Sequence, residues 1–223
     1  MKAKDWMRNI VAFVVITLVS GICFAYSDEG FQYWSGASAS VNINKDWKVT
    51  VEQELRMGDD GGNLYYEHSD LGFVYKGLAD WVDLSFNYRQ IYEKDGKDHW
   101  QPENRPHLNL TFKGRMFNLP VSNRSRLEFR DLDNKEDVWR YRNKIEVRFP
   151  WKFTAFELQP YLGDDVFIDL DEEDFTKNWL FSGVSFKLLE NLKGEIYYMW
   201  QASKSKKEWK DVHILGTRLK FSF

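Results

Sequence analysis

The chain has 223 residues, of which 17% are aromatic and 29% charged, with a formal net charge of -3 and a mean hydropathy of -0.56. This weak negative charge excludes the basic surface that nucleic-acid binding requires, so we expect no nucleic-acid partner. The only cysteine is Cys23, which excludes a disulfide framework and a thiolate metal site. A water-soluble domain of this polarity rarely carries so many aromatic rings.

The first 25 residues have the layout of a cleaved secretory signal peptide. Three basic residues come early, residues 10–24 are almost wholly apolar, and the segment ends in Ala25. The apolar run is shorter than the roughly 18 residues expected of a spanning helix, which favours cleavage over a membrane anchor. We therefore expect export and a single mature domain over 26–223.

The mature chain alternates apolar and polar residues from residue 31 onward, which is the pattern of β-strands. In 47–57, for example, Val49 and Val51 alternate with Thr50 and Glu52. The same pattern recurs over 64–76, 81–94, 105–115, 121–132, 138–149, 153–170, 178–188, 193–203 and 211–223. No helix of useful length is expected after the signal peptide.

The length of these segments indicates a membrane barrel. They approach or exceed the roughly 9–11 residues with which a tilted strand crosses a bilayer. A sheet that spans a bilayer must close, because lipid leaves no partner for an open edge. We therefore predict an all-β fold, a transmembrane antiparallel up-and-down β-barrel of 10–12 strands in a bacterial outer membrane. Its apolar residues would face lipid and its charged residues the lumen. The alternative is a soluble β-sandwich that acts as a periplasmic binding module.

Connection lengths support the barrel and leave the strand number open. Short turns alternate with longer charged loops from Trp47 to the C-terminus, as periplasmic turns alternate with external loops. This count gives ten strands, and residues 31–43 would add an eleventh where an even number is expected. Residues 26–44 therefore either enter the lumen, pack at the closing seam, or accompany a missed strand that makes twelve.

The last segment is predicted to close the barrel. Phe221 and Phe223, with Leu219, would face lipid, and this strand would be the signal for the barrel-assembly machinery. Outer-membrane lipid and lipopolysaccharide are the other expected partners. Further rings would form girdles at the two membrane surfaces. These are Trp47, Tyr75 and Trp151 at the periplasmic side, and Tyr65, Tyr92, Trp139, Trp179 and Trp200 at the external side.

Several short motifs, in this order and spacing, resemble a family of small bacterial outer-membrane β-barrel proteins classed as a domain of unknown function. They are Trp34, "ELRMGDD" (54–60), "NRSRLEFR" (123–130), "WRYRN" (139–143), "QPYLGDDVFID" (159–169), "YYMWQ" (197–201) and the terminal aromatic. Asp165 stands where the family pattern leads us to expect a glutamate. The resemblance implies a fold and a location over roughly 31–223, and it implies no activity.

Alternation assigns many charged residues to the lumen. The basic residues are Arg124, Arg126, Arg130, Arg140, Arg142, Lys144 and Arg148, and the acidic residues are Glu52, Glu54, Asp70, Asp83, Glu128, Glu146, Glu157 and Asp165. One interpretation is an internal lattice of ion pairs in a structural barrel, because guanidinium groups pair with carboxylates in forked geometry. The other is a narrow channel that prefers small anionic solutes, because basic rings select anions.

No catalytic, cofactor or metal site is predicted. A lipid-modifying barrel enzyme would need a nucleophile beside a base, and "YEHSD" offers only His68 and Ser69, which adjacent strand positions direct to opposite faces. The acidic loops lack calcium-loop spacing. An enzyme or a partner-binding surface barrel therefore remains the alternative to a structural or conducting barrel.

Overall fold

The computed structural model describes residues 30–133, 136–205 and 208–223, so the predicted signal peptide lies outside the described residues. Within these ranges the chain forms eleven β-strands and one short 3-10 turn. The strands are β1 (Phe31–Asn42), β2 (Trp47–Gly58), β3 (Asn63–Ala79), β4 (Val82–Lys94), β5 (Trp100–Met116), β6 (Leu119–Leu132), β7 (Val138–Arg148), β8 (Gln159–Asp169), β9 (Asp174–Leu189), β10 (Leu192–Ser205) and β11 (Glu208–Ser222). In this part of the chain, no helix is long and apolar enough to cross a membrane.

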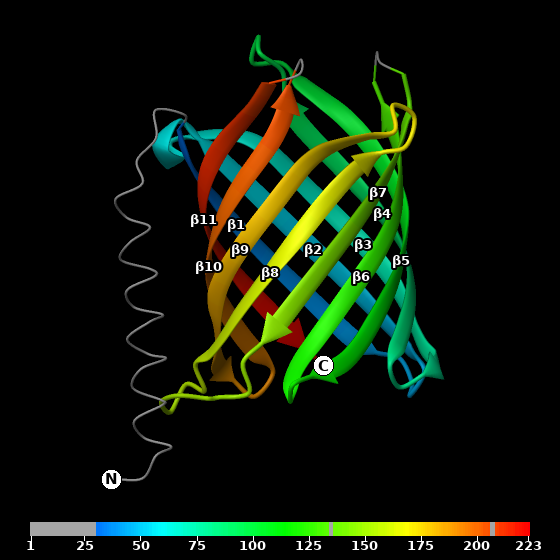
Figure 1. Cartoon of the computed structure of the whole chain (residues 1–223), viewed down its shortest axis with the longest axis vertical. Helices are drawn as coiled ribbons and strands as arrows, with labels where there is room; N and C mark the ends of the chain where they lie inside the picture. Colours follow the sequence, from blue (N-terminus) through cyan, green and yellow to red (C-terminus); the bar gives the residue numbers. More distant parts are fainter. Residues whose placement is uncertain (1–29, 134–135, 206–207) are drawn as a thin grey trace. The chain divides into compact units, whose positions relative to one another are not determined.

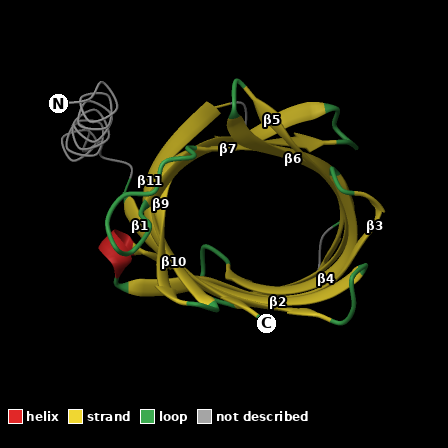
Figure 2. Ribbon diagram, turned by 90° about the horizontal axis from the view of Figure 1, so that it is seen from below, coloured by secondary structure: helices red, strands yellow, loops and turns green. Residues whose placement is uncertain are grey.

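The eleven strands close into a barrel (Figures 1 and 2). Each strand from β1 to β10 pairs antiparallel with the next strand along the chain. The last strand, β11, then pairs with β1 and completes the ring. Closure leaves no free edge, which is how a barrel satisfies every backbone donor and acceptor along its strands. The predicted closed, all-β barrel is confirmed.

The seam between β1 and β11 differs from the prediction of a fully antiparallel barrel. These two strands run parallel, from Phe31 opposite His213 to Ser40 opposite Ser222. An odd number of alternating strands makes the first and last run in the same direction, so an eleven-strand barrel requires one parallel pair. Phe223 extends the seam, because its backbone N–H donates to the Ser40 carbonyl over 2.9 Å. Of the alternatives for residues 26–44, the part from residue 31 therefore packs at the seam as a strand.

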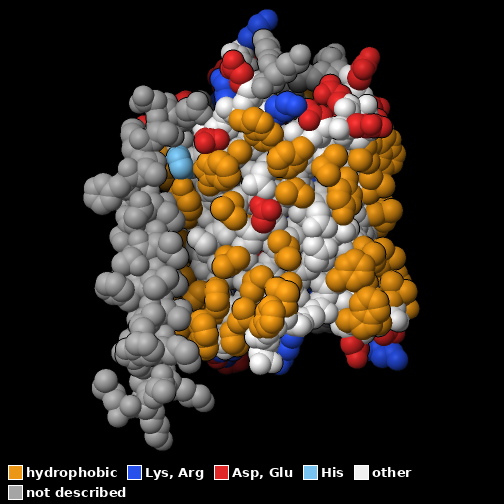
Figure 3. All heavy atoms as spheres, viewed as in Figure 1, with side chains coloured by type: hydrophobic (Ala, Val, Ile, Leu, Met, Phe, Trp, Pro, Cys, Tyr) orange, Lys and Arg blue, Asp and Glu red, His pale blue; other side chains and the backbone are white. Residues whose placement is uncertain are grey.

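The outer face of the barrel is apolar. On β4, Leu84, Phe86 and Tyr88 are exposed on the outside, whereas Arg89 is buried on the inside. Figure 3 shows hydrophobic side chains spread over the visible wall, with most Lys, Arg, Asp and Glu side chains gathered toward the two ends. The barrel is thus inverted relative to a soluble one, because its charged side chains form the interior.

One predicted strand is shorter than expected. The segment 153–170 forms a strand only from Gln159 to Asp169, because the preceding residues fold into a small turn closed by a bridge between Phe153 and Leu158. Thr154 and Glu157 in this turn have positive φ angles, which break the extended backbone. Conversely, the connection between the predicted strands 81–94 and 105–115 is shorter than the sequence pattern indicates, because the second strand begins at Trp100, which pairs with Lys94.

Candidate functional site

The basic residues that the sequence assigns to the lumen lie on the inner faces of β6 and β7. Arg124, Arg126 and Arg130 come from β6, and Arg140, Arg142, Lys144 and Arg148 come from β7. The register places Arg126 opposite Arg142 and Arg124 opposite Lys144. Because every second residue of a strand points to the same side, one register fixes the whole basic wall.

Glu128 is the centre of this wall. Its side chain is 0% exposed and lies within ion-pair distance of three arginines. Arg126 and Arg142 each approach one carboxylate oxygen at 3.2 Å, and Arg140 Nε donates to the other over 2.7 Å. A carboxylate buried this deeply is stable only because cationic donors surround it.

Asp165 on β8 is the second carboxylate of the basic wall. Arg142 Nη2 donates to Asp165 Oδ2 over 2.7 Å, and Arg124 Nη2 lies 3.4 Å from the same oxygen. Arg124 reaches over β7 to make this contact, since β6 and β8 are not neighbours in the sheet. Arg142 therefore bridges Glu128 and Asp165.

The third carboxylate, Glu103, was not among the residues predicted from the sequence. It is 4% exposed on β5, where Arg130 binds it with two hydrogen bonds of 2.9 and 2.8 Å and Arg105 Nη2 approaches it to 2.5 Å. The sequence "QPEN" suggested a loop, which hid Glu103 from the strand pattern. Arg105, two residues along the same strand, begins the predicted strand 105–115, and its alternation with His107 and Asn109 places it in the lumen as well.

On the strands β2 to β4, each lumen arginine has a carboxylate partner. Arg89 Nε donates to Asp70 over 2.8 Å and its Nη2 lies 3.4 Å from Glu52. Arg56 pairs with Glu54 at 2.8 Å, and the 2%-exposed His68 contacts Glu52 at 3.1 Å. The predicted acidic residues Glu52, Glu54 and Asp70 thus lie together in the lumen. Arg56 and Arg89, which alternation could also have found, are their counterions.

A further group joins β7 to the seam. Glu146 pairs with Lys144 at 3.1 Å and with Arg148 at 2.7 Å. Arg148 also reaches Glu195 on β10 at 3.2 Å, and Lys220 on β11 approaches Glu195 to 2.7 Å. Glu195 was not predicted. These ion pairs therefore join β7 to β10 and β11, on the inner side of the intervening strands β8 and β9.

Two predicted acidic residues lie away from these clusters. Asp83 faces inward at the start of β4, and its carboxylate lies 2.8 Å from the Nζ of the more exposed Lys113. Glu157 does not line a strand in the lumen as predicted. It lies in the turn before β8 and forms an ion pair with Lys152, because residues 153–158 turn rather than extend.

Aromatic residues line the other wall of the lumen. They are Trp34, Tyr161, Phe167, Trp179, Phe181 and Tyr197, with Met199 and Ile214 beside them. Trp179 was predicted for the external girdle, but it points inward because β9 starts at Asp174 and its odd-numbered residues face the lumen. Tyr197 and Tyr161 lie over Gly216 and Gly183, where an added Cβ would clash with their rings.

Guanidinium groups stack on these rings. The Arg56 Cζ atom lies 3.7 Å from the ring centre of Trp34 and 3.9 Å from that of Tyr66. Arg142 lies 4.1 Å from the centre of Phe167. Stacking and forked ion pairing are both properties of arginine that lysine reproduces poorly. The aromatic wall therefore holds the arginines in fixed directions.

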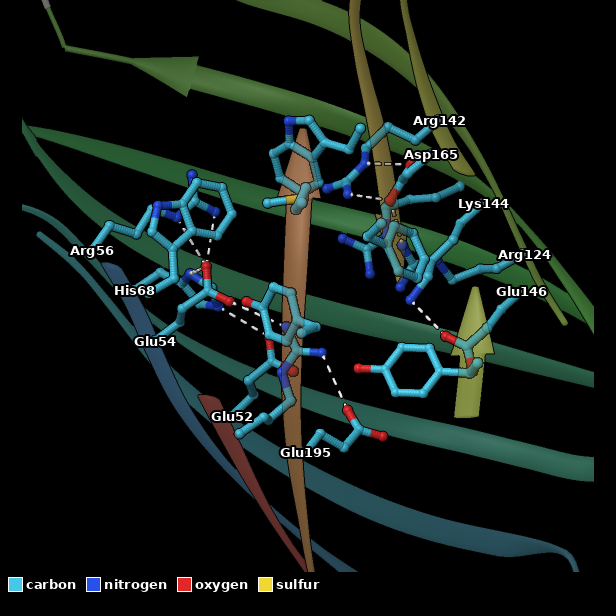
Figure 4. A pocket seen from close by; sticks show the side chains of 18 of the residues that line it. Glu52, Glu54, Arg56, His68, Arg124, Arg142, Lys144, Glu146, Asp165 and Glu195 are labelled. Carbon is cyan, nitrogen blue, oxygen red and sulfur yellow. Dashed lines mark hydrogen bonds and ion pairs between the residues drawn. The ribbon is translucent and has the colours of Figure 1, made fainter. Parts of the chain in front are cut away.

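A cavity of about 120 Å³ remains between the two walls (Figure 4). Its lining includes seven cationic side chains, Arg56, Arg89, Arg124, Arg126, Arg142, Lys144 and Arg218, against the five carboxylates Glu52, Glu54, Glu146, Asp165 and Glu195. Figure 4 shows Arg124, Arg142 and Lys144 on one side of this space together with Asp165 and Glu146, and Glu52 and Glu54 on the other side together with Arg56. The lumen is therefore narrow, and cationic and anionic side chains alternate on both of its sides.

The basic wall has fewer counterions than cations. Among the ion pairs of the described residues, six guanidinium groups of β5 to β7 use only three carboxylates: Arg105, Arg124, Arg126, Arg130, Arg140 and Arg142 against Glu103, Glu128 and Asp165. Arg124 and Trp179 line the cavity, and among the described residues their Nε and Nε1 atoms are buried without a hydrogen-bond acceptor.

Among the described residues, His68 and Ser69 do not form a catalytic pair in the lumen. His68 lies inside the barrel and Ser69 outside, where it contacts Gln53 on the neighbouring strand. His107, buried at 2% exposure, contacts the carbonyl of Arg105 and lies 3.6 Å from Asp70. No group of three or more His, Cys, Asp or Glu residues that could hold a metal ion occurs in the described ranges.

The loop between β4 and β5 has its own electrostatic stabilisation. Backbone N–H groups of His99 and Lys97 donate to Asp95 Oδ1 over 3.0 and 2.8 Å. These hydrogen bonds lower the pKa of the Asp95 carboxyl below its usual value. The Asp95 side chain thus ties a charged loop to a defined conformation.

Comparison with known proteins gives a family but no activity. The model of the family described as "Protein of unknown function (DUF2490)" matches residues 31–212, which is nearly the whole barrel. No curated protein matches the sequence.

Proposed function

Because the chain belongs to the DUF2490 family, whose function is unknown, we propose a function from the lumen geometry. The protein is an integral outer-membrane β-barrel whose charge-lined lumen is a narrow, anion-preferring passage for small solutes. The observation that carries this proposal is the basic wall, where six guanidinium groups share three carboxylates. A surplus of fixed positive charge attracts anions and repels cations.

The membrane location is supported by the outer face. Large hydrophobic side chains are exposed on it, such as Val51, Phe73, Phe86 and Leu108, which would destabilise a barrel in water. Strands of 11 to 17 residues are long enough to cross a bilayer at the usual tilt. Export through the signal peptide 1–25 and insertion by the barrel-assembly machinery through β11 belong to the same proposal.

The size of the cavity limits what could pass. A space of about 120 Å³ accommodates several water molecules or one small anion, so small solutes are the ones that we propose to pass. Arg124 is the residue to which such an anion would bind first, because its side chain lines the cavity, is 27% exposed, and lies as far as 3.4 Å from its counterion Asp165. Arg126 and Lys144 would complete the contact.

A second candidate function, a purely structural barrel, is favoured by the continuity of the ion pairs. Arg142 joins Glu128 to Asp165, and Glu195 joins Arg148 to Lys220. This network could close the lumen permanently and replace the apolar core that a soluble protein would have.

Liposome swelling distinguishes the two functions. The mature chain would be refolded into vesicles, and the influx of small anionic, neutral and cationic solutes of similar size would be compared. Faster influx of the anion that falls in Arg124→Gln supports the passage. Lys113→Gln is the matched control, because Lys113 pairs with Asp83 away from the cavity. Equal impermeability to all solutes, with a folded barrel in the vesicle, would favour the structural function.

A further inference from the structure

The outer wall carries a polar patch in the middle of its apolar surface. We define the outer polar patch as Asn123, Ser125, Tyr141, Asn143, Asp164 and Asn178. Each alternates with an inward residue. Asp164, for example, precedes Asp165, and Asn143 lies between Arg142 and Lys144, which line the cavity. The patch therefore points away from the lumen and takes no part in the proposed passage.

The six residues are contiguous across four strands. One cross-strand row contains Ser125, Asn143, Val166 and Asn178, and the next row contains Asn123, Ile145, Asp164 and Leu180. Tyr141 lies in the row on the other side of the first, and Asn143 donates a hydrogen bond to its hydroxyl. Asp164 is central in β8, five residues from either end. In Figure 3 an acidic side chain stands alone among hydrophobic side chains near the middle of the visible wall.

The patch is hydrogen-bonded within itself. Asn123 Nδ2 donates to Asn143 Oδ1 over 2.8 Å, and Asn143 Nδ2 donates back to Asn123 Oδ1 over 3.2 Å. The Ser125 and Tyr141 hydroxyls are 3.0 Å apart. These contacts hold a set of donors and acceptors in fixed positions on the outer surface.

Asp164 is the residue of the patch whose exposure to lipid is the most unfavourable, because the hydrogen bonds within the patch do not neutralise its charge. It accepts one hydrogen bond, from Asn178 over 2.6 Å, and it pairs with no Lys or Arg among the described residues. Its neighbours Ile145, Leu162 and Leu180 are exposed and apolar. A carboxylate at this depth is unfavourable against lipid, so a protein partner that supplies donors would stabilise it.

Several other outward-facing polar residues lie near strand ends or are uncharged and hydrogen-bonded. Gln90, Asn104 and Asp131 lie within a few residues of the ends of their strands. The pair Gln53 and Ser69 is neutral and hydrogen-bonded. Only part of the outer wall therefore needs a polar partner.

We propose that the outer polar patch is the contact surface of a homodimer within the membrane, an inference that rests on the membrane location proposed above. A second copy fits because the patch carries an acidic acceptor, Asp164, beside the amide groups of Asn178 and Asn123, each of which makes one Nδ2 hydrogen bond within the patch and has a second N–H to donate. In a two-fold interface the same patch meets itself, so the acceptor of each copy can lie against the donors of the other. Asparagine side chains commonly make such contacts between membrane segments.

Cysteine cross-linking in outer membranes tests the dimer. The mature chain after Ala25 contains no cysteine, so Leu180→Cys and Phe73→Cys introduce single thiols. The two positions are comparably exposed, at 52% and 47%, but Leu180 borders Asp164 whereas Phe73 lies between the apolar Val49 and Phe86. With a short bis-maleimide, we expect a product of twice the monomer mass from Leu180→Cys and little from Phe73→Cys.

Adding Asp164→Leu and Asn178→Leu to the Leu180→Cys protein should weaken dimerisation about tenfold, as expected for the loss of two symmetry-related hydrogen bonds between Asp164 of one copy and Asn178 of the other. Light scattering of the wild-type protein in mild detergent gives an independent mass if this variant does not fold. Equal cross-linking at both positions, a product of another mass, or a monomer by both methods would overturn the dimer. If the monomer stays in carbonate-washed membranes, only this inference fails and the proposed location stands.

Discussion

Replacing Glu128 with glutamine tests the ion-pair network most sharply. The side chain keeps its size, but its negative charge is removed from beside Arg126, Arg140 and Arg142. Glu128 is fully buried, so water cannot replace the lost charge. Removing one partner of a buried ion pair typically destabilises a protein by about 3–5 kcal/mol.

That loss should be visible as a lower unfolding temperature. For a chain of about 150–250 residues, each kcal/mol lowers Tm by about 2–4 °C, so Glu128→Gln should unfold roughly 6–20 °C below the wild type. A folded barrel migrates differently from an unfolded one on a detergent gel, and the fraction that changes mobility can be followed with temperature. Asp83→Asn is the control, because its partner Lys113 is 43% exposed and such pairs contribute about 0–1 kcal/mol.

The double variant Glu128→Gln with Arg140→Gln should recover part of the stability, because Arg140 forms its ion pair with Glu128 and one uncompensated cation is removed with the carboxylate. Our reasoning is refuted if Glu128→Gln unfolds at the same temperature as the wild type, or if Asp83→Asn is the more damaging change. Either result would mean that the charges of the lumen are hydrated rather than paired.

Three further predictions concern the seam, the packing of the lumen and a loop. Deleting Phe223 removes two backbone hydrogen bonds to β1, one of them to Ser40, and should lower the midpoint of the mobility change. Gly216→Val should prevent assembly, since a Cβ there would lie 2.0 Å from the Tyr197 ring, and Tyr197→Ala added to it should restore a folded band on the same gel. The lowered pKa of Asp95 means that its contribution to loop stability is present above the pKa of the unfolded carboxyl and is lost as the pH falls through the folded one. Protease cleavage of the loop should therefore increase only at acidic pH and should lose this dependence in Asp95→Asn; a loss of protection near neutral pH would contradict it.

The basic wall could be deduced from the sequence because it depends on alternation alone. Once 121–132 and 138–149 are neighbouring strands, Arg126 and Arg142 must share a face. Closure of the barrel could be deduced for a similar reason, since long two-faced strands leave no stable open sheet. The outer-membrane location stays a prediction.

The residues that sequence analysis missed depend on strand ends and on closure. Glu103 was hidden because Pro102 and Asn104 resemble a loop. Trp179 was misassigned because β9 has apolar residues on both faces here, with Leu180 between Trp179 and Phe181, so alternation alone does not tell which face is inward. The parallel seam could not be derived either. Whether residues 31–42 pair with β11 depends on the circumference of the whole barrel, which no single segment encodes.

The central claim, an anion-preferring lumen, is tested most directly by the reversal potential of the refolded mature chain in a planar bilayer under a potassium chloride gradient. The account predicts discrete conductance steps with a reversal potential on the chloride side, shifted toward zero in Arg124→Gln and unchanged in Lys113→Gln. A reversal potential on the potassium side, or one that does not respond to Arg124→Gln, would contradict it.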